Sequence, residues 1–187
     1  MFQKPQDSLE MVEQRLRAMR PDPENAHDAY VMAAIEEAIL AVKEGNFGVG
    51  AVMVDPSGAI VQRGHNRVFA PYFRSDLHAE MDVLTRFEER FKDQTSMAGY
   101  TLVTSLEPCP MCLTRLISAQ IGKVYYAAQD SEGGMATRLP LLPPVWVELS
   151  SRQVFAAAQC APELGELSLQ VVLTTAQANT QRLLERK

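Results

Sequence analysis

The chain has 187 residues, of which 47% are hydrophobic and 22% charged, with a net charge of −5 and a pI near 5.3. Such a chain can bury one sizeable core, but its acidic balance argues against a broad surface for polyanions. With no apolar run long enough for a bilayer, no secretory signal pattern in residues 1–10 and too few cysteines for a disulfide framework, we expect a cytoplasmic protein without membrane association.

Two helices are predicted at the N-terminus. Asp7 and Glu10 have the spacing of a capping box before apolar residues at helical intervals, and Pro21 ends this first helix. A second helix is expected over 28–43, because its apolar residues recur every three to four positions and Gly45 follows.

Strands follow these helices. Residues 48–54 and 59–64 flank the turn sequence 55–58 and predict an antiparallel hairpin. Helices and strands then alternate, with a helix over 78–91, a strand over 100–104, a helix over 110–121 and a strand over 123–128. Continuous apolar strands joined through helices favour parallel pairing, so the predicted fold class is α/β, a three-layer α/β/α sandwich with a mixed five-stranded sheet.

The C-terminal segment 131–187 is less regular. It begins with a loop that becomes proline-rich. After this loop we expect a short helix over 151–158, a last strand over 167–174 and an exposed final helix over 175–186. We expect one domain over 1–187, with an N-terminal helical extension over 1–27 and a divergent C-terminal segment over 131–187.

The pattern that carries chemistry joins His78 and Glu80 to Cys109 and Cys112. This is the H-x-E and P-C-x-x-C arrangement of zinc-dependent nucleobase deaminases. Imidazole nitrogen and thiolate sulfur are zinc ligands, and three protein ligands leave a fourth position for a water whose pKa falls to about 7. The sequence therefore predicts one Zn²⁺ per subunit, bound by His78, Cys109 and Cys112.

Glu80 is predicted to be the catalytic proton carrier. It lies two residues beyond His78 in the first turn of a helix, from which its carboxylate can reach the activated water. Pro110 suits the first position of the helix that carries both cysteines, where the helix dipole favours thiolates.

Plainer interpretations remain open for each half of the pattern. A lone C-x-x-C occurs in redox pairs, and a lone histidine on an amphipathic helix is commonly packed in the core. A structural zinc site needs a fourth protein ligand, for which only Cys160, His27 and His65 remain.

These residues resemble the cytidine deaminase superfamily, in the branch of guanine deaminases, fungal-type cytosine deaminases and bacterial tRNA adenosine deaminases. The resemblance covers about residues 28–130 and includes further short motifs, at 49–52, 64–67, 104–107 and 121–126. It implies that Asn66, the backbone amide of Ala79 and Asp130 contact the substrate. It also implies a homodimer, and a pocket completed by the C-terminal segment or a neighbouring subunit. The alternative for Asn66 is a turn residue after a strand, and that for Asp130 is the start of a loop.

The chain departs from that branch at two places. Residues 73–77 read FRSDL where Asp-Pro-Thr-Ala is common, and Arg115 replaces a small residue, so that its guanidinium must reach solvent, a subunit boundary or a carboxylate.

The acidic charge favours a small-molecule substrate, a free nucleobase or nucleoside, with a guanine-like purine ahead of cytosine or a related heterocycle. A tRNA-specific adenosine deaminase is the first alternative, so nucleic acid is disfavoured as a partner without being excluded. A non-catalytic zinc-binding partner subunit is the second.

Overall fold

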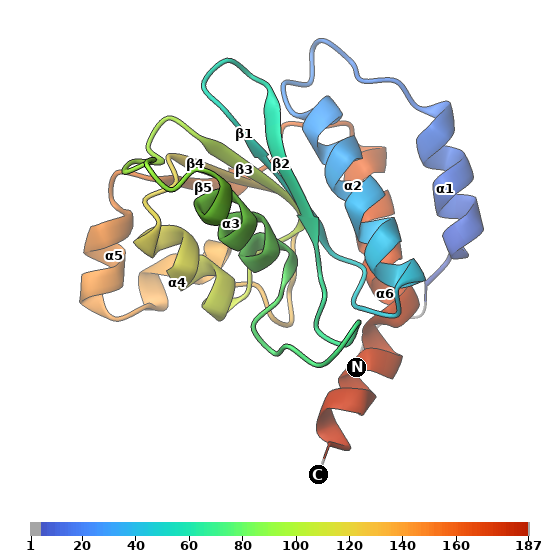
Figure 1. Ribbon diagram of the computed structural model, residues 1–187. Coiled ribbons are helices and arrows are strands. Elements are labelled where there is room, and N and C mark those ends of the chain that lie inside the picture. Colours follow the sequence, from blue (N-terminus) through green and yellow to red (C-terminus); the bar gives the residue numbers. More distant parts are fainter. Residues whose placement is uncertain (1–4, 187) are drawn as a thin grey trace.

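A five-stranded mixed sheet lies between two layers of helices in the computed structural model, which describes residues 5–186 (Figure 1). The strand order is β2-β1-β3-β4-β5. The strands are β1 Gly50–Val54, β2 Ile60–His65, β3 Thr101–Leu106, β4 Lys123–Ala128 and β5 Val154–Ala157. β1 runs antiparallel to β2 and β3, whereas β3, β4 and β5 are parallel. The predicted fold class, including the hairpin, is confirmed.

The helices divide between the two faces of the sheet. On one face lie α1 Leu9–Ala18, α2 Asp28–Lys43 and α6 Pro162–Leu184; on the other lie α3 Ala79–Arg90, α4 Pro110–Ser118 and α5 Pro144–Ser150 (Figure 1). A 3₁₀ turn over Ala136–Leu141 precedes α5. Among the described residues, no helix combines the length and apolar character that a bilayer span requires.

The interior strand β1 illustrates why both faces of the sheet are covered. All five of its residues are buried. Because side chains alternate along a strand, Val52 and Val54 pack with α2 and α6 while Ala51 and Met53 pack with α3. A strand buried on both sides needs apolar residues at every position, as the sequence GAVMV provides.

The N-terminal predictions are right in extent and wrong in one detail. α2 has the predicted bounds, and Gly45 after it adopts φ +86°, the left-handed conformation that ends helices. The cap of α1 is Ser8, whose Oγ accepts the Met11 N–H at 3.3 Å. Asp7 forms an ion pair instead of a capping box. Residues 1–4 of the predicted 1–27 extension, and residue 187, lie outside the described residues.

The C-terminal predictions are wrong in two places. Residues 154–157 of the expected short helix form β5, which pairs in parallel with β4. The expected strand 167–174 belongs to α6, a helix of 23 residues. Leu164, Leu167 and Val171 recur at helical spacing and are fully buried in the core shared with α2. That packing outweighs the β-branched composition of the segment. The helix over 175–186 is accordingly the end of α6, with Ala176 and Asn179 buried.

Candidate metal and substrate site

The three predicted zinc ligands lie together where two helices begin. His78 is the N-cap of α3, Cys109 is the N-cap of α4 with Pro110 next to it, and Cys112 lies in the first turn of α4. One ligand atom from each lies within 4.8 Å of the others. The His78 Nδ1 and Cys109 Sγ atoms are 3.5 Å apart. The two helix starts thus bring residues 31 positions apart into one cluster.

This donor set fits zinc. Tetrahedral coordination with Zn–N and Zn–S bonds of about 2.0 and 2.3 Å separates nitrogen from sulfur by about 3.5 Å. The separation of His78 Nδ1 from Cys109 Sγ matches that value. Among the described residues, the cluster contains one histidine and two cysteines, and no fourth side chain of a ligating type. His27 stacks on Tyr125, and His65 lies between two glutamates, so neither is the fourth ligand of a structural site.

The two cysteines differ in their acidity. Hydrogen bonding from Cys112, together with the neighbouring His78, lowers the pKa of Cys109 to about 4. The same hydrogen bond and burial raise the pKa of Cys112 well above its usual value. The Cys109 sulfur is therefore a thiolate at neutral pH, which is the form that binds metal.

Glu80 lies beside this cluster in the first turn of α3, and only 3% of its surface is exposed. Burial and the proximity of Cys109 raise the pKa of its carboxyl group. A carboxyl group held away from water with a raised pKa exchanges protons near neutral pH more readily than a solvated one does.

A cavity of about 210 Å³ opens in front of the cluster. Its polar lining includes Asn66, His78, Glu80, Cys109 and Asp130, so five of the predicted site residues face one space. The remaining lining is mainly apolar and comes from the segment before β1, the end of β3 and α6. These residues are Phe47, Val49, Leu106, Val172, Ala176 and Leu183, together with the acidic Glu107. The cavity therefore offers mostly apolar walls with a few polar groups, as small-molecule sites do.

Asn66 and Ala79 occupy positions consistent with their predicted roles. Asn66 is 2% exposed, and its Oδ1 accepts the Val68 N–H at 3.1 Å, so this side chain also stabilises the turn after β2. Its amide nitrogen is the group that remains available for a substrate acceptor. Ala79 is the first residue of α3, where backbone N–H groups have no partner within the helix. Both substrate contacts stay predictions.

Asp130 is held in place by Glu107, whose role the sequence did not reveal. Glu107 is 2% exposed, and its Oε2 accepts the Asp130 N–H at 3.1 Å. Its Oε1 accepts both the N–H and the hydroxyl of Thr137, at 2.7 and 2.8 Å. Gly134 packs so closely on this carboxylate that a Cβ there would lie 2.4 Å from Oε2. Glu107 thereby fixes the loop 130–137 at the rim of the cavity. In the sequence, this role of Glu107 was indicated only by its position directly before Pro108 and Cys109.

Two arginines near the site are paired with acids. Arg115 of α4 bonds to Glu88 of α3, which is the carboxylate partner that its unusual position required. Arg74 forms two hydrogen bonds with Asp76, at 2.9 and 2.8 Å. Neither guanidinium points to a substrate role.

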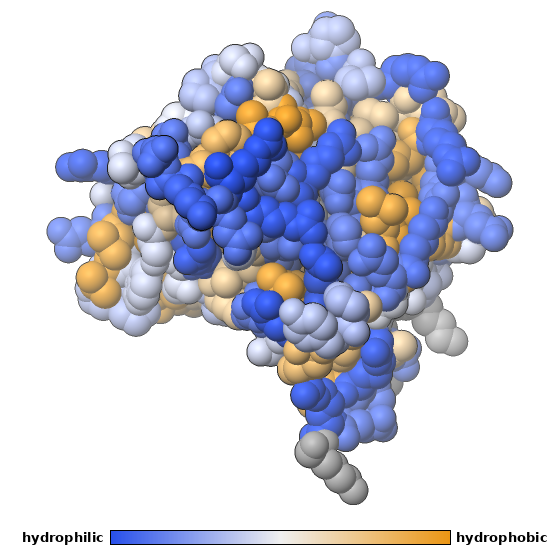
Figure 2. Space-filling view, in the orientation of Figure 1, coloured by the Kyte–Doolittle hydropathy of each residue, from blue (hydrophilic) through white to orange (hydrophobic). Residues whose placement is uncertain are grey.

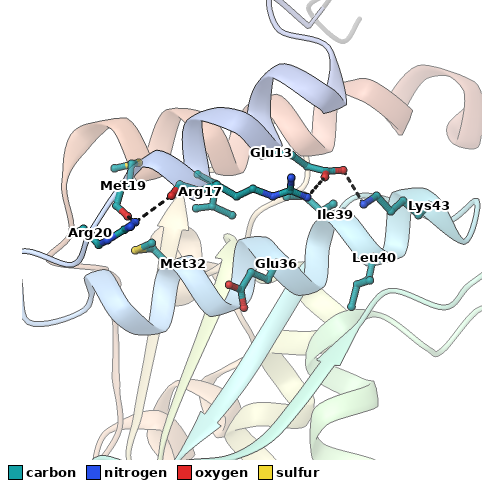
Figure 3. Close-up of a pocket in the computed structure, with 10 residues that line it drawn as sticks. Glu13, Arg17, Met19, Arg20, Met32, Glu36, Ile39, Leu40 and Lys43 are labelled. Carbon is teal, nitrogen blue, oxygen red and sulfur yellow. Dashed lines mark hydrogen bonds and ion pairs between the residues drawn. The ribbon is translucent and has the colours of Figure 1, made fainter.

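A second cavity, of about 390 Å³, lies between α1 and α2 (Figure 3). Its apolar lining includes Met19, Met32 and Ile39. Three of its charged residues bond to one another, since Glu13 pairs with Lys43 at 2.7 Å and with Arg17 at 3.0 Å. It has no cysteine or histidine in its lining. The chemistry of the chain is therefore concentrated at the first cavity.

Comparison with known proteins agrees with this site. The family model described as the cytidine and deoxycytidylate deaminase zinc-binding region matches residues 24–128. The tRNA-specific adenosine deaminase of Bacillus subtilis is 37% identical over 114 residues, 60% of this chain and 68% of that protein. The matched family region contains all three predicted ligands and is a zinc-binding one, so zinc as cofactor is confirmed.

Solved structures extend the likeness to the fold. One from a study of A-to-I editing by tRNA:A34 deaminases is 29% identical, with a TM-score of 0.59, over 68% of this chain and 96% of that one. Guanine deaminase from Nitrosomonas europaea is 20% identical, with a TM-score of 0.62, over 83% of this chain and 88% of that one. At that identity the second likeness concerns the fold alone. The segment 131–187 lies outside the family match.

Proposed function

The chain belongs to the cytidine and deoxycytidylate deaminase family, and we propose that it removes the exocyclic amino group from an adenine in an unpaired stretch of tRNA. The observation that carries the reaction type is the buried carboxylate of Glu80 beside a three-ligand cluster that faces a base-sized cavity. Three ligands rather than four are what a catalytic zinc site needs.

His78, Cys109 and Cys112 would hold the metal. When bound, zinc would act as a Lewis acid that lowers the pKa of a water, so that the water can lose a proton and attack an aromatic carbon at neutral pH. The N-terminus of α4 stabilises the thiolate of Cys109, and the burial of Cys112 shields the second sulfur from bulk water.

Glu80 would carry the proton through the reaction. Its carboxylate takes a proton from the attacking water and gives it to the ring nitrogen beside the attacked carbon. A second proton passes by the same carboxylate to the amino group, the C–N bond breaks, and ammonia leaves as the C=O bond forms. The Asn66 amide and the Ala79 N–H would hold the ring against the zinc cluster, and Asp130 would contact its rim.

Two observations support tRNA adenine as substrate. The relative with 37% identity is a tRNA-specific adenosine deaminase, and the solved structure with 29% identity belongs to the same activity class. This revises the substrate that the net charge of −5 favoured, because overall charge does not determine the charge of a local surface.

A free purine base such as guanine is the second candidate. The observation that favours it is α6, which contributes Val172, Ala176 and Leu183 to the walls of the cavity. Such apolar closure over a volume of about 210 Å³ suits a small heterocycle that enters alone.

A substrate screen tests the proposal. Purified zinc-loaded protein is incubated with tRNA carrying adenosine at position 34, and separately with adenine, guanine, cytosine and their nucleosides, while ammonia and product are measured. We expect inosine in the tRNA. Release of ammonia from guanine alone would transfer the assignment to the second candidate. No release from any substrate by protein containing stoichiometric zinc would indicate a non-catalytic partner subunit.

We also propose, from the family resemblance, a homodimer with one zinc per subunit. Light scattering during gel filtration tests this, with a mass near twice 20.8 kDa expected. A single 20.8 kDa species at micromolar concentration would contradict it.

A further inference from the structure

A hollow lined by two arginines and two phenylalanines lies where the end of α6 meets the loop between β2 and α3. It measures about 440 Å³ and is lined by Phe69, Phe73, Arg182, Glu185 and Arg186. The Arg182 guanidinium carbon lies 3.9 Å from the centre of the Phe69 ring, and that of Arg186 lies 3.1 Å from the centre of the Phe73 ring. In Figure 1 this end of α6 projects beyond the rest of the fold, with the loop close to it.

The hollow lies next to the candidate substrate cavity. Phe47 lines that cavity, its ring centre is 5.8 Å from that of Phe69, and Phe69 is 6.0 Å from Phe73. On the helix, Leu183 lines the cavity and its neighbour Arg182 lines the hollow. Nucleotides that flank a base bound in the cavity can therefore reach these rings and arginines.

The two guanidinium groups keep their positive charge available. Arg182 donates hydrogen bonds to neutral acceptors only, the Gly45 carbonyl at 3.0 Å and Asn179 Oδ1 at 2.9 Å. In the part of the chain that the structure describes, neither Arg182 nor Arg186 forms an ion pair with a carboxylate.

Neighbouring charges differ in this respect. Arg74, in the same loop as the phenylalanines, is neutralised by Asp76 at 2.8 Å. Glu185 accepts a hydrogen bond from Gln181 at 2.6 Å, along its own helix. Figure 2 shows the projecting end of α6 covered mainly by hydrophilic residues. The hollow thus combines two unpaired cations with partly exposed aromatic rings, of which Phe73 is 37% exposed.

This combination matches a single-stranded polynucleotide. Guanidinium groups bind phosphate oxygens in a bidentate manner, and aromatic rings stack against unpaired bases. A free base has no phosphate for the arginines and no second base for the rings. We propose that Phe69, Phe73, Arg182 and Arg186, here called the arginine–phenylalanine platform, bind the nucleotides that flank the target base in RNA. This proposal rests on the proposed function and adds the surface that selects RNA over the free base.

The test uses the full chain loaded with zinc and the double variant Arg182→Gln/Arg186→Gln. The ligand is a fluorescent RNA stem-loop with an unpaired adenosine in its loop, and its Kd is measured by anisotropy at several salt concentrations. We expect the Kd to rise about tenfold or more. The slope of log Kd against log salt should fall by about 0.7 for each phosphate that the variant no longer neutralises.

Arg90→Gln is the matched control, because Arg90 also stacks on a ring, that of Phe91 at 4.9 Å, but at the end of α3. Melting temperature and zinc content verify that each variant folds. The double variant Arg182→Lys/Arg186→Lys retains charge, and it should restore most of the salt dependence without full affinity.

Each outcome bears on one proposal. Equal Kd and equal salt slope in the wild type and the Arg182→Gln/Arg186→Gln variant would overturn the platform, even where RNA is deaminated. Arginine-dependent binding without inosine formation would support the platform and overturn the proposed function.

Discussion

Two regions meet at the cavity and contribute to it in different ways. Residues 78–112 contain the proposed metal ligands and Glu80, at the starts of α3 and α4. α6, which begins fifty residues further along the chain, and the residues directly after it supply an apolar wall and the arginines of the platform. The first region lies inside the family match and the second lies outside it. We therefore propose that reaction chemistry and substrate selection depend on separate parts of this chain.

The largest effect is expected from breaking the first region alone. His78→Ala removes one of three ligands, so zinc content should fall from one per chain to near zero, and deamination should fall to background. Elemental analysis and ammonia release measure both. His27→Ala is the matched control, since His27 stacks on Tyr125 away from the cavity. Stoichiometric zinc in His78→Ala would refute the ligand assignment.

A second effect is expected at Glu107, which connects the first region to the loop 130–137. Glu107→Gln places an N–H₂ group where a carboxylate oxygen accepts backbone or hydroxyl donors. We expect kcat/KM to fall about 10- to 100-fold at unchanged zinc content, because hydrogen bonds to charged groups contribute about 1.5–3 kcal/mol.

Thr137→Val, which removes one of these bonds, should have a smaller effect, and Thr137→Ser should restore activity. Steady-state kinetics distinguish the variants. Wild-type kcat/KM in Glu107→Gln would show that the loop 130–137 does not depend on this carboxylate.

The wall contributed by α6 should change substrate affinity without changing the metal site. Ala176→Val adds two methyl groups to the cavity, and we expect KM to rise about tenfold, the size of effect that one methylene has in a snug pocket. Ala178→Val, on the exposed face of the same helix, is the matched control. An unchanged KM together with a loss of zinc in Ala176→Val would contradict this division between the regions.

The smallest effect is expected on the stability of the fold, at His65, which connects β2 to α2 and α3. His65 at the end of β2 lies 2.9 Å from Glu37 and 3.1 Å from Glu44, both from the α2 segment, and its backbone N–H bonds to Asp82 of α3. The hydrogen bond to Glu37 opposes the desolvation of the ring and, with Glu44, raises the pKa of His65 above 6.5.

A raised folded-state pKa stabilises the protein fully below pH 6.5, and this contribution is lost as the pH rises through the folded-state value. His65→Gln should therefore lower the free energy of unfolding by about 1–2 kcal/mol more at pH 6 than at pH 9. Denaturant unfolding at the two pH values measures the difference. An equal loss at both would show that the histidine is not charged in the folded protein.

The two regions also differ in how far the sequence predicts them. His78, Glu80, Cys109 and Cys112 could be placed because capping residues, Pro110 and helical periodicity are local signals, and the bounds of α2 followed from the same kind of signal. α6 could not be placed, because the run of leucine, valine and threonine over 167–174 suits a strand as well as a buried helix. Its burial against α2 decides between them. The hydrogen bonds of Glu107 depend on a loop 23 to 30 residues away, which no short motif specifies.

The most direct test of the central claim is ammonia release by Glu80→Gln on the substrate that the wild type deaminates. Glu88→Gln, on the same helix and outside the cavity, serves as the control. The account predicts that Glu80→Gln keeps one zinc per chain and the wild-type melting profile yet loses at least 10²- to 10⁴-fold in rate, the range of general acid–base catalysis. Full activity in Glu80→Gln with zinc in place would contradict it.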